Sequence, residues 1–205
     1  MKTIFKILPL MLFSFLGCKA QNVNQNSIPK NAEDISPLLI GETLPDADLQ
    51  DDEGRTIKLS EVLANKPSVV VFYRGGWCPY CNLQLSGLVQ IEKDILDLGY
   101  QIIAISPDDY QNLKNTEEKD SINYQLYSDP NAKLIQDIGI AFQTPIMVKG
   151  YIATKNMKGK TSEILPVPTV LVVDQDGKIL FEYINPNYKE RISSEMLLAV
   201  LKTIK

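Results

Sequence analysis

The fold is decided by residues 69–81, Val69-Val-Val-Phe-Tyr-Arg-Gly-Gly-Trp-Cys-Pro-Tyr-Cys81. The segment begins with a continuous β-branched and aromatic run, which predicts that residues 67–73 form a strand buried on both faces. Pro79 directly follows Cys78, and proline is favoured at the first position of a helix. The segment therefore predicts a buried strand, a turn that contains two glycines, and a helix whose N-terminus lies at two cysteines.

The sequence on either side extends this pattern into an α/β fold. The helix is expected to continue to about Leu98, with Gly99 ending it, and a second buried strand is expected over residues 100–106. Strand, helix and strand in this order form a βαβ unit, which requires a parallel pair. The apolar stripe predicted for the helix consists of Leu83, Leu85, Leu88, Ile91, Ile95 and Leu98.

Shorter elements are predicted around this unit by turn residues and local patterns. A hairpin is expected from strands over 46–49 and 55–59, and a second over 168–183 around Gln175-Asp176-Gly177. Ser60 is expected to cap a short helix to Ala64, and Ser193 or Ser194 a final helix to Ile204. Further elements are a helix begun by Pro107-Asp108-Asp109, a strand over 125–128 and a helix over 132–138, whereas residues 141–165 lack clear periodicity.

The beginning of the chain predicts export. Lys2 and Lys6 precede a short apolar run over residues 7–16 and the small residue Gly17, which is the pattern of a secretory signal over residues 1–17. The run is about half as long as a helix needs to cross a bilayer, so a transmembrane anchor is not expected. The chain has 205 residues, a net charge of −4 and no basic cluster, so one domain is expected and nucleic acid is not an expected partner.

Cys18 follows the signal directly. Phe15-Leu16-Gly17-Cys18 resembles the lipobox of bacterial lipoproteins, which implies that Cys18 is lipidated and becomes the first residue of the mature chain. The alternative is cleavage near Ala20, which would discard Cys18 and leave a soluble periplasmic protein. Residues 18–38 are predicted to be a polar tether and residues 39–205 the domain. Lys19 after the cysteine favours an outer-membrane lipoprotein on the periplasmic side, attached to the membrane by the lipid alone.

Cys78 and Cys81 are the predicted reactive groups. A helix N-terminus stabilises a thiolate and lowers the pKa of the thiol, and a second sulfur three residues on can resolve an oxidised product. A structural disulfide is a poorer interpretation, since so short a loop gives only about 2 kcal/mol. The mature domain has no histidine and no third cysteine, which argues against zinc and excludes histidine-dependent triads. Inert buried thiols are disfavoured by the glycine-flanked position, which is expected to be wet. The chain has no glycine-rich phosphate loop, so a nucleotide cofactor is not expected.

Residues 72–81 resemble the active-site segment of the peroxiredoxin-like branch of the AhpC/TSA (alkyl hydroperoxide reductase and thiol-specific antioxidant) family, within the thioredoxin-fold superfamily. The resemblance covers about residues 39–203 and implies a central mixed sheet flanked by helices with a peroxiredoxin-like N-terminal hairpin. Further matching residues are Gly41, Pro45, Gly54, Ser128-Asp129-Pro130, residues 165–168, residues 170–174, Gly177, Pro186-Asn187-Tyr188 and Arg191.

The chain departs from the Pro-x-x-x-Thr-x-x-Cys segment of typical peroxiredoxins. Aligned with it, Arg74 stands at the proline, Cys78 at the threonine and Cys81 at the peroxidatic cysteine, and Pro168 takes the place of the arginine that polarises the peroxide. Val167-Pro168-Thr169 instead resembles thioredoxin, where a cis-proline faces the dithiol. The resemblance to thioredoxin implies that Cys78 is the attacking sulfur, whereas the resemblance to peroxiredoxins implies Cys81. We favour Cys78, because it precedes the helix and is expected to be the more exposed.

The residues around the dithiol have alternative interpretations. Trp77 either shields the dithiol or is simple packing, and Arg74 either supplies positive potential or is a solvated charge; Tyr188 and Arg191 match the family without a derived role. The sequence predicts an exported thiol-dependent antioxidant enzyme that reduces hydroperoxides with an external reductant, thioredoxin-like or membrane-supplied. The alternatives are a thiol-disulfide oxidoreductase acting on disulfides, and a redox-inactive tethered module that binds a partner through residues 141–165.

Overall fold

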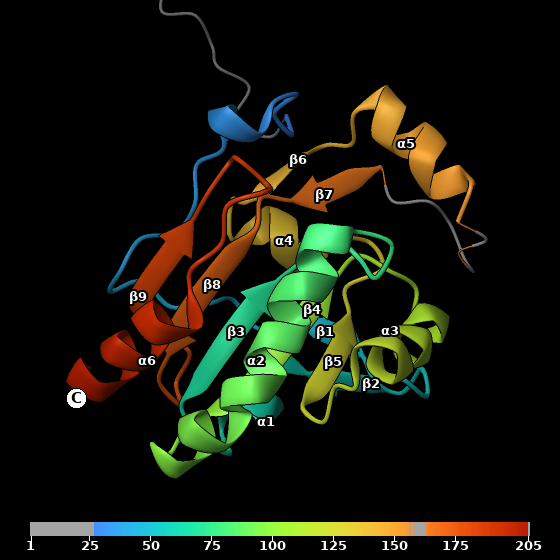
Figure 1. The fold of residues 1–205 in the computed structure, drawn as a ribbon. Helices are drawn as coiled ribbons and strands as arrows, with labels where there is room; N and C mark the ends of the chain where they lie inside the picture. Colours follow the sequence, from blue (N-terminus) through green and yellow to red (C-terminus); the bar gives the residue numbers. More distant parts are fainter. Residues whose placement is uncertain (1–26, 156, 158–162, 205) are drawn as a thin grey trace, which may run out of the picture.

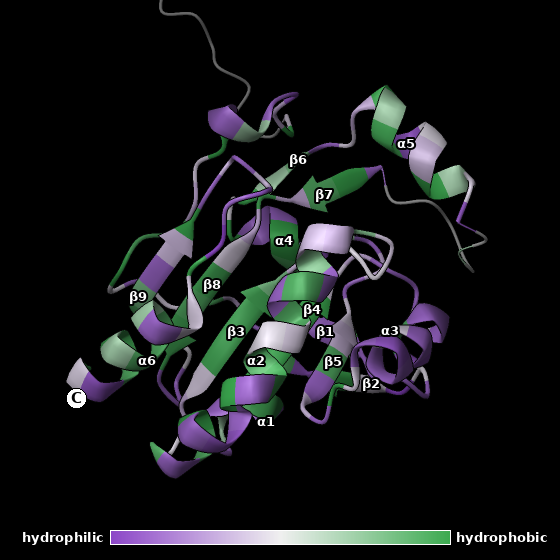
Figure 2. Ribbon diagram, viewed as in Figure 1, coloured by the Kyte–Doolittle hydropathy of each residue, from purple (hydrophilic) through white to green (hydrophobic). Residues whose placement is uncertain are grey.

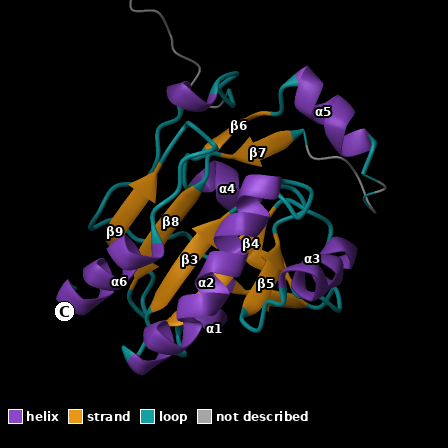
Figure 3. Ribbon diagram, viewed as in Figure 1, coloured by secondary structure: helices purple, strands orange, loops and turns teal. Residues whose placement is uncertain are grey.

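The computed structural model describes residues 27–155, 157 and 163–204, which form an α/β fold with a mixed sheet between helices (Figure 1, Figure 3). The sheet has seven strands in the order β2-β1-β5-β4-β3-β8-β9, and β6 and β7 form a separate pair. The predicted α/β class is confirmed. The strands are β1 Asp48–Gln50, β2 Thr56–Lys58, β3 Ser68–Phe72, β4 Gln101–Ser106, β5 Gln125–Ser128, β6 Ala141–Gln143, β7 Ile164–Pro166, β8 Thr169–Val173 and β9 Ile179–Ile184. The helices are α1 Leu59–Leu63, α2 Pro79–Asp97, α3 Leu113–Asp120, α4 Lys133–Asp137, α5 Ile146–Ala153 and α6 Ser194–Thr203, with 3-10 turns η1 Ala32–Asp34 and η2 Tyr110–Asn112.

Strand β3 is the centre of the sheet, and all five of its residues are buried. It pairs in parallel with β4 and antiparallel with β8, so that Val70 lies opposite both Ile103 and Leu171. Alternate side chains of β3 point to opposite faces of the sheet. Val71 packs in the cluster with α2 and α6, and Val70 packs in the cluster with α1 and α4. Burying each valine stabilises the fold by about 2 kcal/mol. In Figure 2 the strand is mostly green, whereas the outlying helix α3 is mostly purple.

The βαβ unit is confirmed, but the predicted stripe of α2 is partly wrong. Leu85, Leu88 and Ile95 are buried, whereas Leu83 is 73% exposed and Leu98 is 37% exposed. Two residues of a helix turn the side chain by about 200°, so Leu83 lies on the side opposite Leu85. Leu83 therefore contributes to the surface and not to the core.

The two predicted caps have different outcomes. Ser60 lies inside α1, which begins after Lys58 without a side-chain cap, so the prediction for Ser60 is wrong. Its backbone N–H instead donates to Asp46 Oδ1 at 3.0 Å, and this bond is the main reason that the pKa of Asp46 is lowered. The cap of α6 is confirmed at Ser193, whose Oγ accepts from the N–H of Met196 at 3.1 Å.

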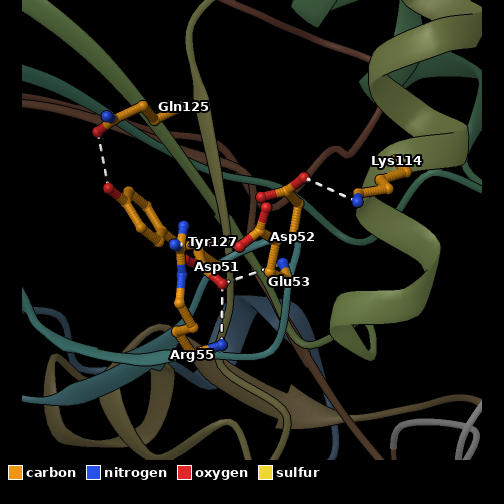
Figure 4. Close-up of polar contacts among 7 residues, drawn as sticks. All are labelled: Asp51, Asp52, Glu53, Arg55, Lys114, Gln125 and Tyr127. Carbon is orange, nitrogen blue, oxygen red and sulfur yellow. Dashed lines mark hydrogen bonds and ion pairs between the residues drawn. The ribbon is translucent and has the colours of Figure 1, made fainter.

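The N-terminal hairpin is confirmed as the antiparallel pair β1–β2. Figure 4 shows its turn, in which Arg55 Nε donates to Asp51 Oδ2 at 2.7 Å and Lys114 of α3 pairs with Asp52 at 3.5 Å. Gly54 has a φ of +80°, which explains the glycine at this position. The charges of the turn thus attach the hairpin to α3.

Residues 27–38, predicted to be the end of the tether, lie against the domain. The N–H groups of Ser36 and Leu38 donate to Gly139 O and Ile138 O at 3.2 and 3.1 Å, and Gln143 N–H donates to Pro29 O at 2.8 Å. The packed chain therefore extends N-terminal to residue 39. The predicted signal and Cys18 lie outside the described residues. Within 27–155, 157 and 163–204, no helix is both long and apolar enough to span a bilayer.

The segment without clear periodicity contains three short elements, β6, α5 and β7. Thr144 N–H donates to Glu163 O at 2.9 Å, and Lys149 pairs with the Glu163 carboxylate, so the two ends of this segment are joined. Its strands are only three residues each, which is too short for a sequence period to be visible. Figure 1 shows that α5 lies away from the central sheet, beside β6 and β7.

Gly139→Ala is predicted to destabilise the protein by about 1–3 kcal/mol. Gly139 has a φ of +74°, and an added Cβ would lie 1.9 Å from Ser36 O, so the N-terminal segment would be displaced. Urea unfolding measures the change. Gly150→Ala is the matched control, because nothing lies within 4 Å of its Cβ in helix α5, and it should stabilise by about 0.5–1 kcal/mol. Equal midpoints for the two variants would contradict the prediction.

Candidate active site

Cys78 and Cys81 lie at the start of α2 as free thiols. Cys78 is the N-cap residue, and its carbonyl accepts from the N–H groups of Cys81 and Asn82, both at 3.1 Å. The expectation of a wet, exposed position is wrong: Cys78 is 1% exposed and Cys81 is 0% exposed. Both sulfurs belong to the hydrophobic cluster that also contains Trp77. Any reagent must therefore reach them through a covered site.

The two thiols have pKa values shifted in opposite directions. The hydrogen bond from the Cys81 thiol is the largest cause that lowers the pKa of Cys78 to about 6, against the opposing effect of burial. The Cys81 backbone N–H and the charges of Arg74 and Arg191 lower it further. Burial is the largest cause that raises the pKa of Cys81 well above its usual value, and the neighbouring Cys78 raises this pKa further. At neutral pH the pair therefore consists of a Cys78 thiolate that accepts a hydrogen bond from a Cys81 thiol.

Arg191 contacts the dithiol from the loop between β9 and α6. Its Nη2 donates to Cys81 Sγ at 3.7 Å, and its Nη1 donates to Glu190 O at 2.8 Å. No local pattern indicates a role for Arg191, because it is 110 residues from Cys81; its match to the family pattern is the signal that could have identified it. It is the functional residue that local sequence reasoning missed.

Arg74 is held between two aromatic rings. Its guanidinium carbon lies 5.0 Å from the centroid of Trp77 and 4.5 Å from that of Tyr188. Arg74 is 5% exposed, so the interpretation as a solvated charge is wrong. Among the ion pairs of the described chain, none joins Arg74 or Arg191 to a carboxylate. Both charges are thus available to an anion at the sulfurs.

Two aromatic residues of the cysteine segment, Trp77 and Tyr80, each pack edge-on against a tyrosine from another part of the chain. Trp77 is buried and meets Tyr151 of α5 edge-on, with ring centroids 6.2 Å apart. Tyr80, which stands between the cysteines in the sequence, meets Tyr188 edge-on, with ring centroids 5.6 Å apart. Trp77 is thus a packing residue of the site that also supports Arg74.

Asp108 fixes the loop that carries the cysteines. Its Oδ2 accepts from the N–H of Gly76 at 2.8 Å, and burial raises the pKa of this carboxyl to about 7. A Cβ at Gly75, whose φ is +135°, would lie 2.5 Å from Asp108 Oδ1, and a Cβ at Gly76 would lie 2.0 Å from Thr116 Oγ1. Both glycines are therefore required by close approach. Asp108 was expected only at a helix start.

Pro168 and Thr169 lie at the same end of the sheet, since Thr169 is opposite Phe72 in the β3–β8 pairing. The resemblance to thioredoxin implied a cis bond at Pro168, but the described residues contain no cis peptide bond, so this expectation is wrong. Val167 N–H donates to Ile140 O at 2.8 Å, which extends the β6–β7 pairing almost to Pro168, and β8 begins at the next residue. A trans bond connects the two strands directly. Thr169 Oγ1 donates to Val167 O at 2.9 Å.

Comparison with known proteins gives one family and one fold. The profile of the AhpC/TSA family matches residues 40–181. The chain is 24% identical to peroxiredoxin Bcp of Escherichia coli K12, covering 82% of this chain and 98% of that protein. It is 31% identical to peroxiredoxin bcp1 of Schizosaccharomyces pombe, where the match covers 51% of this chain and only 53% of that protein.

Solved structures have the same fold. The crystal structure of peroxidoxin BcpB from Mycobacterium tuberculosis is similar with a TM-score of 0.62 at 22% identity, covering 81% of this chain and 97% of that one. Reduced Prx3 from Vibrio vulnificus, in its complex with H2O2, has a TM-score of 0.68 at 19% identity, covering 80% and 99%. These matches confirm the resemblance seen in residues 72–81 and the predicted thioredoxin fold.

Arg74→Gln is predicted to raise the pKa at which the first proton leaves the dithiol, by about one unit or more. The substitution removes a buried positive charge that stabilises the Cys78 thiolate. Arg191→Gln should cause a smaller rise, because its charge has the weaker effect on Cys78. Ultraviolet absorbance of the thiolate measures the titration. Lys155→Gln is the control: Lys155 lies 4.5 Å from the Tyr151 ring, beyond the site. An unchanged pKa in Arg74→Gln would contradict the electrostatic argument.

Proposed function

We propose, since the chain belongs to the AhpC/TSA family and is an oxidoreductase of that family, that it reduces hydroperoxides with the Cys78 and Cys81 thiols. The observation that supports this most strongly is the pair of sulfurs at the start of α2 with two guanidinium groups nearby and no carboxylate paired to either among the described residues. This arrangement favours an ionised Cys78 next to a protonated Cys81, which is the state that a two-step reduction needs.

In the proposed mechanism, the Cys78 thiolate attacks one oxygen of the hydroperoxide, and the O–O bond breaks. Cys78 becomes a sulfenic acid, and the leaving alkoxide takes a proton and departs as an alcohol, or as water from H2O2. The Cys81 sulfur then attacks Cys78 Sγ, releasing water and forming the Cys78–Cys81 disulfide. The peroxide gains two electrons and the dithiol loses two. An external thiol reductant restores the dithiol.

The guanidinium groups have a role in each step. Arg74 and Arg191 stabilise the attacking thiolate and are placed to stabilise negative charge that develops on the leaving oxygen. Arg191 also lies 3.7 Å from Cys81 Sγ, where it favours the thiolate that this residue must form before it attacks. These two arginines would supply the charge that is absent at Pro168.

Burial of the dithiol favours a small substrate over a protein disulfide. Cys78 is 1% exposed and packs in the same hydrophobic cluster as Trp77. A small hydroperoxide needs less room than a disulfide on a protein surface to reach a sulfur that is covered in this way. The second candidate function, thiol-disulfide exchange, is supported by the Cys-x-x-Cys spacing. A redox-inactive binding module has weaker support, because free thiols with separated pKa values serve no need of binding.

Stopped-flow mixing of reduced protein with one equivalent of H2O2 tests the proposal. Wild type should lose two thiols rapidly and form an intramolecular disulfide. Cys81→Ser should accumulate a sulfenic acid at Cys78, and Cys78→Ser should react no faster than a free thiol. Sulfenic acid in Cys78→Ser alone would make Cys81 the attacking sulfur. Slow loss in wild type together with rapid exchange with a small disulfide would instead establish disulfide exchange.

We also propose that the protein is exported and lipidated at Cys18, with residues 1–17 removed. The support is the sequence alone: the basic start, the short apolar run and the lipobox-like Phe15-Leu16-Gly17-Cys18. A lipid chain would hold the domain at the periplasmic surface of a membrane, where a reductant must be supplied through the membrane or by a periplasmic thiol protein.

Expression of the full chain in a bacterial host with radiolabelled palmitate tests this location. Wild type should carry the label and partition into detergent, and Cys18→Ser should do neither. Mass spectrometry of the mature N-terminus provides an independent measurement. A soluble periplasmic product that begins near Ala20 would contradict lipidation while retaining export, and an uncleaved cytoplasmic product would contradict both.

A further inference from the structure

A surface pocket of about 250 Å³ lies beside the dithiol, between α2 and the segment over residues 189–197. Arg191 lines it and also contacts Cys81 Sγ, so the pocket and the active site share this residue. Tyr80, between the two cysteines in the sequence, lines the same space. A molecule that binds Arg191 in this pocket would therefore lie next to the residue that contacts the dithiol, although neither cysteine lines the pocket itself.

The pocket combines cationic and apolar groups. Lys189 and Arg191 line it, no acidic side chain does, and neither cation is in an ion pair with a described residue. Arg191 Nε is buried and has no hydrogen-bond partner, and the described ring contact of Lys189 is with Tyr188, at 5.9 Å. Leu83, which is 73% exposed, and Ile192 add apolar surface.

We propose that this pocket binds the carboxylate-bearing part of a low-molecular-weight organic thiol that reduces the Cys78–Cys81 disulfide. The proposal rests on the proposed function, which requires an external thiol but does not identify its chemistry. Charge complementarity selects the ligand class: Lys189 and Arg191 match a carboxylate, and Leu83 and Ile192 match a short carbon chain. The volume suits a small organic molecule and is too small for a folded partner.

The reaction balances with two molecules of this thiol. The first, as thiolate, attacks Cys78 Sγ; the disulfide bond breaks, and Cys81 leaves as a thiolate 3.7 Å from Arg191 Nη2, then takes a proton. The second attacks the external sulfur of the mixed disulfide, releasing the oxidised dimer of the thiol and the Cys78 thiolate. The two thiols lose two electrons, and the protein disulfide gains them. A carboxylate held by Lys189 and Arg191 would keep the attacking sulfur close to the dithiol, because Arg191 itself contacts Cys81 Sγ.

Alkylation of the reduced protein by iodoacetate and by iodoacetamide tests the pocket without any peroxide. The same thiolate attacks both reagents. Iodoacetate carries a carboxylate, whereas iodoacetamide carries a neutral amide in its place. Lys189→Gln is expected to lower the ratio of the iodoacetate rate to the iodoacetamide rate by about fivefold. Lys155→Gln removes an equal charge on the Tyr151 side and should leave the ratio unchanged. Equal ratios in wild type and Lys189→Gln, or equal decreases in both variants, would overturn the carboxylate site.

Reduction of the oxidised protein then tests the thiol. 3-Mercaptopropionate should reduce the disulfide faster than its neutral amide, and Lys189→Gln should remove most of this preference. No preference in wild type, despite a Lys189-dependent alkylation ratio, would overturn the assignment to a reductant. Failure of the proposed function has a different signature: Cys78 would react with neither alkylating reagent faster than a free thiol does.

Discussion

Two guanidinium groups, that of the buried Arg74 and that of the half-buried Arg191, lie at the centre of the chemistry of this protein. Arg74 and Arg191 approach the dithiol, and no carboxylate in the described chain is paired with either. An unpaired charge away from water is costly, so the nearby group that can ionise is driven to do so. Asp108 does not take this role, because burial keeps the pKa of its carboxyl at about 7. The Cys78 thiolate is therefore the favoured counter-charge, and the two guanidinium groups add to the hydrogen bond from the Cys81 thiol, which is the largest cause of the low pKa of Cys78.

The sheet and the loop hold this charge arrangement in place. Strands β3 and β4 are parallel, so the cysteine loop after β3 and Asp108 after β4 emerge at the same edge. The Asp108–Gly76 hydrogen bond then fixes the loop, and Gly75 and Gly76 allow the close approach that a side chain would prevent. The buried strand β3 therefore has two roles: it forms the core, and it determines the position at which the helix with the two thiols begins.

The parts of the fold that depend on local pattern could be predicted from the sequence, and those that depend on distant contacts could not. The buried strand β3, helix α2 and both hairpins follow from apolar periods and turn residues. The contact of Arg191 with Cys81 joins residues 110 positions apart, and no local pattern contains it. The burial of Cys78 depends on a cluster whose other members, such as Val167 and Leu197, are distant in the sequence. Ser60 failed as a cap for the same reason, since Asp46, 14 residues earlier, takes its place.

The departures from the typical peroxiredoxin segment are linked by charge. Aligned with that segment, the chain has Pro168 where the peroxide-polarising arginine would stand, and Arg74 where a proline would stand. Arg74 is now stacked between two rings, and Arg191 reaches the second sulfur from the loop after β9. Compared with the typical segment, positive charge is thus absent at Pro168 on the sheet edge and is present instead on the two loops that carry Arg74 and Arg191. A cysteine at the usual threonine position needs this arrangement, because the hydroxyl that it replaces carries no charge to be stabilised, whereas a thiolate does.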